Sequence, residues 1–211
     1  LYGPAGFDEF QFRAGLPLSG ADEPVPPPTA EDHAAITALA PAYGLDLSPP
    51  SAAFGSEPRM RMTLPDEGKR IAAAGDLYRF LAVSEDTDGR YALWHATLPP
   101  GGGPPLHSHA NEDEAFFVLS GTITFQADGG SRRLGPGGLA HLPSGTRHRF
   151  ANETAEPAAV LILVAPGGLE RMFERTGRIW HDAGSLPGPP DAAELERLAT
   201  AAPDFGIELY L

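Results

Sequence analysis

The chain has 211 residues and a formal net charge of −13 at pH 7, which argues against nucleic acid as a partner. It contains no cysteine, which excludes disulfides, thiolate metal ligands and cysteine nucleophiles. No apolar run approaches the roughly 18 residues of a membrane span, and no basic and then apolar leader opens the sequence, so we expect a cytoplasmic protein without a membrane partner. The 25 glycines and 23 prolines favour an all-β fold with many turns, and a single lysine among the 15 basic residues favours a bacterial source.

The two ends of the chain repeat each other. Residues 1–47 align without gaps on residues 163–209, and 13 of the 47 aligned positions are identical. Repeats of this length indicate duplicated structural units. Because the second copy follows a complete set of predicted strands, we expect residues 1–50 to be the closing strand and helical tail of a preceding barrel. An N-terminal arm that only resembles the C-terminal tail is the alternative.

Each copy of the repeat contains a signal for the start of a helix. Thr29 with Asp32, and Asp191 with Glu194, fit a helix cap followed three residues later by an acid. Apolar residues at helical spacing follow each cap. We expect both helices to pack on the outside of a barrel and to carry no chemistry of their own.

The segment between the two tails is predicted to form successive short strands. Nine strands at this spacing, with few helices between them, favour a sandwich or a barrel. We therefore expect a barrel over residues 51–167 and a helical tail over residues 168–211. The nine predicted strands are 77–84, 90–98, 106–109, 114–119, 122–127, 131–134, 139–142, 147–150 and 158–165.

The most informative residues lie between Gly101 and Gly121. His107 and His109 alternate along a predicted strand, so both side chains point to the same face. A carboxylate close to these two histidines could come from Glu112, Asp113 or Glu114. The spacing to Gly121 along the sequence favours Glu114, and so does its expected orientation on the strand. We expect Glu112 and Asp113 to be solvated turn residues.

A third histidine comes from a second segment. His148 lies between Gly145 and Asn152, where the spacing predicts a tight turn and a returning strand. Three imidazoles and one carboxylate suit one divalent transition metal ion. The sequence predicts that His107, His109, Glu114 and His148 hold this ion, and it does not choose among iron, manganese, nickel, cobalt, copper and zinc.

Six further residues are candidates for a substrate pocket beside the metal. Two are histidines on predicted strands that could face the cavity, although a structural role explains them as well. The other four are apolar residues, which packing of the barrel core also explains. The six candidates are His95, Phe116, Val118, Phe125, His141 and Phe150.

The two segments resemble the signature motifs of the cupin superfamily. The first has the form G-x5-H-x-H-x4-E-x6-G from Gly101 to Gly121, and the second has the form G-x5-P-x-G-x2-H-x3-N from Gly137 to Asn152. The resemblance implies a double-stranded β-barrel of the jelly-roll type with short flanking helices, and a metal ion held by the three histidines and the glutamate. Gly138 departs from the family, in which many members carry aspartate, but this turn position leaves the metal ligands intact.

A closer resemblance covers Arg59 to Gly177. The stretches GDLYRFL, EDTDGRYAL and PPGGGPPLHSH…EDEAFFVLSGTITFQ are similar to bacterial quercetin dioxygenase-like cupins. This implies dioxygenation of a flavonol or another enolisable small molecule by O2. From its place beside the histidines, Glu114 is the catalytic candidate, which can either bind the metal or take a proton from a bound hydroxyl group. The resemblance also implies the C-terminal cupin of a bicupin, paired in a homodimer or packed against another cupin domain. The alternatives are a metal-dependent isomerase or cyclase that uses the ion as a Lewis acid, and a non-catalytic ligand-binding cupin.

Overall fold

The computed structural model describes residues 7–15, 24–45, 47, 61–127, 129–182 and 184–210. The chain divides into two compact units, Leu1–Pro58 and Arg59–Leu211. Within the described ranges, no helix is both long enough and apolar enough to cross a membrane.

The first unit is helical. Its elements are α1 (Phe7–Ala14), α2 (Ala30–Leu39) and the 3-10 helix η1 (Ala40–Tyr43). Thr29 caps α2 as predicted, because its side chain accepts from the amide of Asp32 while the Asp32 carboxylate accepts from the amide of Thr29. The rings of Phe10 and Tyr43 pack with their centroids 5.5 Å apart, which joins α1 to η1. The closing strand expected at the start of the chain falls largely on residues outside the described ranges.

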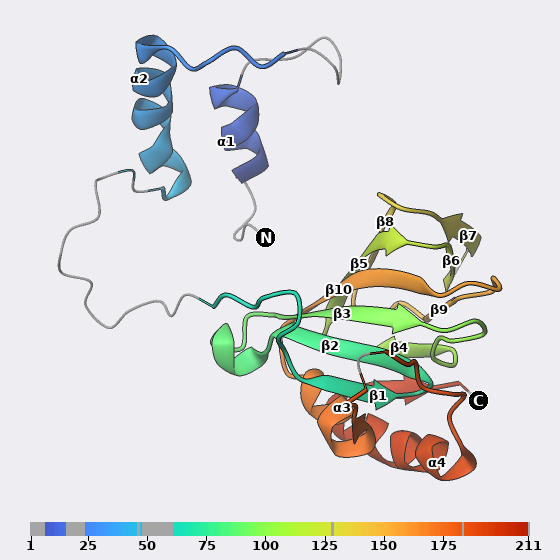
Figure 1. Cartoon of the computed structure of the whole chain (residues 1–211). Helices are drawn as coiled ribbons and strands as arrows, with labels where there is room; N and C mark the ends of the chain where they lie inside the picture. Colours follow the sequence, from blue (N-terminus) through green and yellow to red (C-terminus); the bar gives the residue numbers. More distant parts are fainter. Residues whose placement is uncertain are drawn as a thin grey trace. The chain divides into compact units, whose positions relative to one another are not determined.

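The second unit contains two antiparallel sheets (Figure 1). The larger has the strand order β11-β1-β2-β3-β10-β5-β8, and the smaller has the order β12-β4-β9-β6-β7. This confirms the predicted all-β barrel of the jelly-roll type. The elements are β1 (Arg70–Ala73), β2 (Asp76–Ala82), η2 (Ser84–Asp86), β3 (Ala92–Leu98), β4 (His107–His109), β5 (Asp113–Ser120), β6 (Ile123–Ala127), β7 (Gly130–Leu134), β8 (Leu139–Leu142), β9 (His148–Ala151), β10 (Ala158–Ala165), α3 (Glu170–Thr176), β11 (Arg178–Ile179), α4 (Ala192–Ala201), η3 (Ala202–Phe205) and β12 (Ile207–Leu209).

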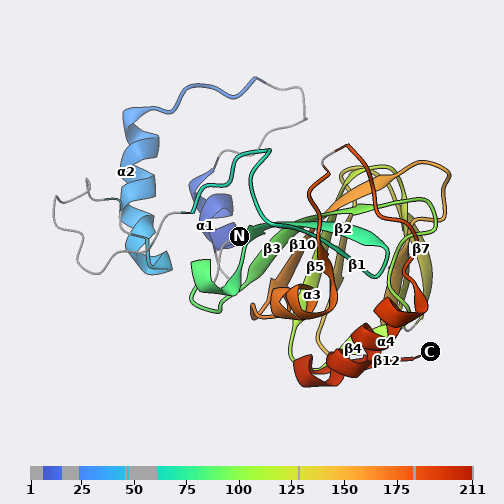
Figure 2. The ribbon, with the colours of Figure 1, turned by 60° about the horizontal axis from the view of Figure 1, so that its bottom comes forward.

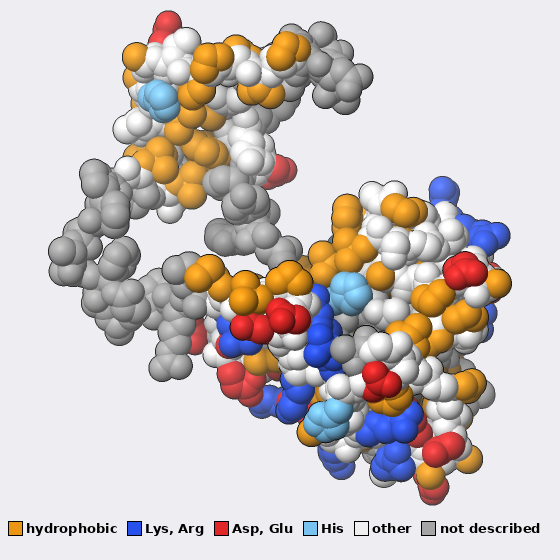
Figure 3. Space-filling model, viewed as in Figure 1, with side chains coloured by type: hydrophobic (Ala, Val, Ile, Leu, Met, Phe, Trp, Pro, Cys, Tyr) orange, Lys and Arg blue, Asp and Glu red, His pale blue; other side chains and the backbone are white. Residues whose placement is uncertain are grey.

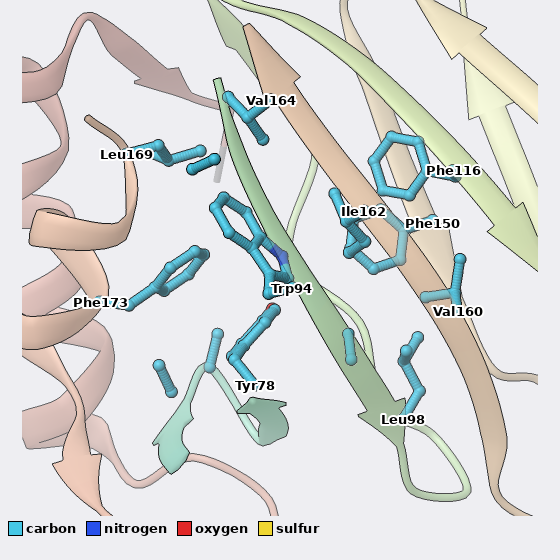
Figure 4. Packing of buried hydrophobic residues seen from close by; sticks show 14 of the residues in the cluster. Tyr78, Trp94, Leu98, Phe116, Phe150, Val160, Ile162, Val164, Leu169 and Phe173 are labelled. Carbon is cyan, nitrogen blue, oxygen red and sulfur yellow. The ribbon is translucent and has the colours of Figure 1, made fainter. Parts of the chain in front are cut away.

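All nine predicted strands are present, and the described residues add three short ones, β1, β11 and β12. Burial alternates along β2, β3 and β10, so one face of the larger sheet is covered and the other is partly open. Trp94, Phe116 and Val160 are fully buried on this covered face (Figure 4). Removing these apolar side chains from water drives the two sheets together.

The turn between β5 and β6 requires glycine. Gly121 has φ +72°, and a Cβ at this position would lie 2.7 Å from the Cα of Ala158. Any other residue would meet both a conformational cost and a backbone clash. The backbone alone therefore requires the last glycine of the first motif, and no chemical role is needed to explain it.

The C-terminal tail packs into the barrel rather than only against its outside. The Phe173 ring of α3 stacks on Tyr78 with centroids 4.4 Å apart and meets the Trp94 ring edge-on (Figure 4). Further along, α4 leads through η3 to β12, which pairs with β4 (Figure 2). The tail therefore continues beyond its helices to the strand that bears two histidines of the motif, which the sequence did not indicate.

Candidate metal centre

The structure brings the four predicted metal ligands together. His107 and His109 come from β4, His148 from β9 and Glu114 from β5 of the facing sheet. His107 lies directly opposite His148 in the β4–β9 pair. All four side chains are buried, and one ligand atom from each lies within 4.8 Å of the others. The alternation of the strands thus points all four groups into the barrel.

Backbone carbonyls orient two of the imidazoles. Nδ1 of His107 lies 2.9 Å from the carbonyl oxygen of Pro105, and Nδ1 of His148 lies 3.0 Å from that of Thr146. A carbonyl oxygen only accepts, so each Nδ1 carries the proton and donates it. Both Nε2 atoms are left with a free lone pair directed into the cluster, which is the arrangement that metal-binding histidines need.

The inward-facing atoms lack partners. Oε2 of Glu114 approaches Nε2 of His148 to 2.9 Å and Nε2 of His109 to 3.3 Å. None of these three atoms has a hydrogen bond of suitable geometry within the described residues, although all are buried. Each buried polar atom without a partner costs about 1–3 kcal/mol. Three imidazoles and one carboxylate that converge, with three of their inward-facing atoms lacking a partner, fit a divalent transition metal ion.

The electrostatics of the cluster suit a cation. Burial and the neighbouring His148 lower the pKa of His107 to about 4, so this imidazole is neutral near pH 7. Burial alone would raise the pKa of the Glu114 carboxyl, but the adjacent His148 and the other histidines outweigh it and keep the pKa below its usual range. A neutral imidazole beside an ionised carboxylate is the protonation state in which these residues bind metal.

Glu112 lies beside the ring nitrogen of His109 that does not face Glu114. Its carboxylate is buried, and Oε2 lies 3.5 Å from Nδ1 of His109. Burial lowers the pKa of His109, but the carboxylates of Glu112 and Glu114 outweigh this effect and raise it. The expectation that Glu112 is a solvated turn residue is wrong, because it turns inward beside the imidazole. Asp113 is exposed as expected, and it accepts a hydrogen bond from the amide of Ser144.

A cavity of about 50 Å³ opens beside the ligands. Tyr78, Trp94, Phe150 and Ile162 of the barrel form part of its wall. The rest comes largely from the tail, whose contribution the motifs could not indicate. The seven tail residues that line the cavity are Leu169, Met172, Phe173, Leu198, Ala202, Ile207 and Leu209.

The four apolar candidates for the substrate pocket lie in different places. Phe150 lines the cavity, while Phe116 packs behind it with ring centroids 4.9 Å apart and Val118 lies in the core. Phe125 is also in the core and borders a different depression on the surface. These positions show that only Phe150 of the four apolar candidates reaches the ligands' cavity.

His95 and His141 do not line the cavity, so the expectation that they face it is wrong. His95 neighbours Trp94 on β3, and because Trp94 points inward, His95 points to the opposite face beside Arg79. His141 is exposed on β8. The alternation around Trp94 was a signal in the sequence that could have excluded His95.

A second buried polar pair reaches the cavity wall through Tyr78. The hydroxyl of Tyr78 donates to the carboxyl of Asp76 over 3.4 Å, and neither residue is appreciably exposed. Burial raises the pKa of Asp76 to about 8, which the Gly103 amide and Tyr78 only partly offset. Asp76 therefore carries a proton at neutral pH. Nε1 of Trp94, also at the cavity wall, has no hydrogen-bond partner within the described residues.

Comparison with known proteins agrees with this geometry. Residues 94–164 match the cupin domain family, a range that runs from β3 to β10 and includes all four candidate ligands. These residues form a cupin domain. The chain is 30% identical over 132 residues to quercetin 2,3-dioxygenase of Bacillus subtilis, an alignment that covers 63% of this chain and 39% of that protein.

Two further proteins are similar to about half of this chain. The chain is 30% identical over 127 residues to the probable oxidoreductase virH of Hypocrea virens, covering 56% of this chain and 58% of the relative. The solved structure of KdgF from Halomonas sp. is 18% identical, with a TM-score of 0.48, and covers 54% of this chain and 99% of that one. The chain thus spans well under two thirds of the length of both curated relatives.

Proposed function

We propose that the cupin domain binds one divalent transition metal ion through His107, His109, Glu114 and His148 and dioxygenates a small enolisable substrate. The observation that carries this proposal is the buried cluster of ligand atoms without partners. The choice of a dioxygenase is supported by the similarity to a protein named quercetin 2,3-dioxygenase. Iron, manganese, nickel, cobalt, copper and zinc all fit this donor set.

When bound, a divalent ion would supply a Lewis acid that acidifies an enolic or phenolic hydroxyl group. Glu114 is placed to take the released proton, because its carboxylate is ionised and faces the cluster. The Nδ1–H donors of His107 and His148 stay with their carbonyl partners and hold the rings in place. The resulting enolate of the substrate is electron-rich and reacts with O2.

The cavity wall indicates the substrate class. Aromatic and aliphatic side chains predominate, and the barrel side adds the N–H of Trp94 and the side chain of Tyr78 to the candidate ligands as polar groups. Such a wall favours an aromatic substrate that carries oxygen substituents. The cavity volume of about 50 Å³ holds one or two water molecules, whereas small-molecule sites commonly measure about 300–1,000 Å³. A flavonol therefore enters only when the tail residues at the wall move.

The test combines metal analysis with oxygen uptake. Protein purified without added metal is analysed for bound first-row metals, reconstituted with each metal in turn, and assayed for O2 consumption with quercetin and smaller enolisable ketones. We expect one metal ion per chain and O2-dependent turnover. Glu114→Gln and His148→Ala should lose metal or activity, while His141→Ala, an exposed histidine of the same barrel, should retain both.

Each other result identifies a different function. Turnover of an enolisable substrate under strict anaerobiosis would replace the dioxygenase with a metal-dependent isomerase or cyclase. Metal and ligand binding without turnover would indicate a binding protein. Full metal content in both Glu114→Gln and His148→Ala would overturn the proposed metal site itself.

A further inference from the structure

The indole N–H of Trp94 is a buried donor that the fold leaves unused. Trp94 is 1% exposed, and its Nε1 has no hydrogen-bond acceptor among the residues that the structure describes. A buried tryptophan N–H usually finds a partner, because an unpaired donor costs about 1–3 kcal/mol. Packing accounts for the ring, which meets Phe80 and Phe173 at centroid distances of 6.0 and 5.6 Å. It does not account for the nitrogen, since an aromatic ring without an N–H would pack equally well.

This N–H lies at the cavity beside the candidate metal ligands. Trp94 lines the cavity together with Phe150 and Ile162. In Figure 4, the nitrogen edge of the indole lies on the side of Ile162 and Phe150, whereas the six-membered ring lies on the side of Leu169 and Phe173. The donor is therefore directed at the space that a bound molecule would occupy, and not at the tail.

The strand register places Trp94 at a distance from the candidate ligands on the same inner face. Trp94 on β3 pairs with Ile162 on β10, and Val164 of the same strand pairs with Glu114 on β5. Two strand spacings of about 4.8 Å and two residues of about 3.3 Å separate Glu114 from Trp94, so their Cα atoms lie about 12 Å apart. Both side chains point into the barrel, which shortens the gap between their polar ends. A molecule with a single ring has the length to bridge this gap.

The chemistry at the two ends of this gap differs. The metal end would take an ionised oxygen, whereas an indole nitrogen only donates and therefore needs an acceptor. Tyr78, the other polar residue that the barrel adds to the wall, directs its hydroxyl to Asp76. The side chains between the ends, such as Phe150 and Ile162, are apolar. A ligand that lacks an acceptor at the far end would leave the Trp94 N–H unpaired, and sites of this kind reject such ligands.

Surface charge offers no comparable selection on the face shown in Figure 3. There, acidic and basic side chains of the second unit are interspersed with hydrophobic ones. A mixed surface does not concentrate ligands of one charge, as a patch of a single sign would. Discrimination between similar neutral molecules therefore depends on the wall of the cavity.

We propose that the Nε1–H of Trp94 determines specificity by binding an oxygen atom of the substrate at the end remote from the metal ligands. The substrate is then a small, flat ring compound with an enolic or phenolic oxygen at one end and an acceptor oxygen at the other. Trp94 moves no proton, so it selects and orients the substrate without a chemical step. The proposal rests on the metal end of the proposed function, but it does not require the reaction to be a dioxygenation.

Two pyranones that differ in one oxygen atom test the proposal. Kojic acid carries a hydroxymethyl group at the ring position where allomaltol carries a methyl group, and both chelate metals through the same enolic hydroxyl and ketone. Protein loaded with Zn²⁺ is titrated with each compound by calorimetry, because Zn²⁺ has no redox chemistry and does not consume the probe. The Zn²⁺ content and the melting temperature are measured first in every protein.

The N–H can be removed while the shape of the side chain is kept. The chain has two tryptophans, so Trp180→Phe leaves Trp94 as the single site for a tryptophan analogue. Benzothienylalanine, supplied during expression, replaces the N–H by sulfur in a ring of similar size. The reference is the Trp180→Phe protein with ordinary tryptophan, because Trp180 does not line the cavity. Trp94→Phe in the same background is a second variant that also lacks the N–H.

In the reference protein, we expect kojic acid to bind about 3–10-fold more tightly than allomaltol, which is the size of one neutral hydrogen bond. The ratio should fall to about 1 in the benzothienylalanine protein and in Trp94→Phe. The melting temperature of the benzothienylalanine protein should not fall, because the N–H makes no bond within the described residues. A preference for kojic acid that survives without the N–H overturns the proposal. So does equal affinity in the reference protein, no binding of either probe, or a lower melting temperature of the benzothienylalanine protein.

Failure of this proposal can be told apart from failure of the proposed function. A lost preference for kojic acid in a protein that never consumes O2 overturns the dioxygenase and supports the role of Trp94. O2-dependent turnover with an unchanged preference overturns the role of Trp94 and supports the dioxygenase. Protein that takes up no Zn²⁺ overturns the metal site and, with it, both proposals.

Discussion

Leu209 on β12 lies directly opposite His107 on β4, so the C-terminal tail pairs with the strand that carries two of the four candidate ligands. Next to this pair, the amide of Tyr210 donates to the carbonyl oxygen of Leu106. The tail therefore fixes the edge of β4 that β9 does not occupy. Because the same tail lines the cavity, we expect changes in its packing to affect both the candidate ligands and access to the cavity.

The packing of α4 can be tested with two leucines of the same helix. Leu198→Ala should lower the free energy of unfolding by about 2–4 kcal/mol, because it empties a buried site at the cavity wall. Leu195 is 42% exposed, so Leu195→Ala should cost less than about 1 kcal/mol. Denaturant unfolding measures both. Equal losses would contradict the assignment of Leu198 to the wall. A larger cavity in Leu198→Ala should also favour bulkier substrates.

The role of Glu112 can be separated from that of its neighbour. Glu112→Gln removes the charge beside Nδ1 of His109, and groups that orient a ligand in this way change metal affinity by about 10–100-fold. We expect a loss of this size in a chelator competition with Co²⁺. Asp113→Asn, at the exposed position next in sequence, is the control and should leave the affinity unchanged. Unaltered affinity in Glu112→Gln would show that Glu112 does not support the ligand.

Asp76 makes stability depend on pH. The folded protein holds the proton on Asp76 up to about pH 8, whereas an unfolded chain releases it near the ordinary value of 3.8. Between these values the unfolded state binds fewer protons, so the free energy of unfolding falls as pH rises, by about 1.4 kcal/mol per pH unit. The contribution of protonated Asp76 to the free energy of unfolding is thus complete at low pH, and it is lost as the pH rises to 8.

Asp76→Asn removes this titration. The variant should therefore gain melting temperature relative to the original protein as pH rises from 4 to 8, and the difference between the two curves should be small at pH 4. Asp113→Asn, which removes an exposed carboxylate, is the control for the loss of one negative charge. A flat difference curve for Asp76→Asn would mean that Asp76 is ionised in the folded protein.

The last residue of the second motif is predicted to be structural. Asn152 is fully buried, and its Nδ2 donates to the carbonyl oxygens of Leu98, Pro99 and Glu156. Asn152→Asp would place a carboxylate against three carbonyl oxygens and should destabilise the fold by about 3 kcal/mol or more. Thermal melting near neutral pH measures the loss, and Asn111→Asp, an exposed change of the same chemistry, should have little effect. A melting temperature unchanged in Asn152→Asp would contradict this role.

Much of the barrel and of the ligand cluster follows from local sequence patterns. Alternating burial and turn residues predicted the nine strands, since side chains on a strand point to opposite faces in turn. The same alternation placed His107 and His109 on one face, while the spacing of the two motifs indicated Glu114 and His148 as the remaining candidates. The caps at Thr29 and Asp191 could also be predicted from the sequence, because a capping side chain accepts a hydrogen bond from an amide within three residues of itself.

Other features depended on contacts between residues far apart in the sequence. Periodicity does not reveal that Glu112 turns inward, that His141 lies exposed on an outer strand, or that Asp76 is buried without a charged partner. Nor does it indicate that Leu198 and Leu209 line the same cavity as candidate ligands some 50 to 100 residues earlier in the chain.

The sequence by itself determined the strands and the caps, because these depend on residue types at short spacing, and it showed the repeat and the four candidate ligands through aligned segments and two spaced motifs. Only the tertiary structure decided how the imidazoles are oriented, how small the cavity is, and which segment closes it. Those properties depend on the docking of the tail against β4, which depends on which apolar surfaces meet and exclude water.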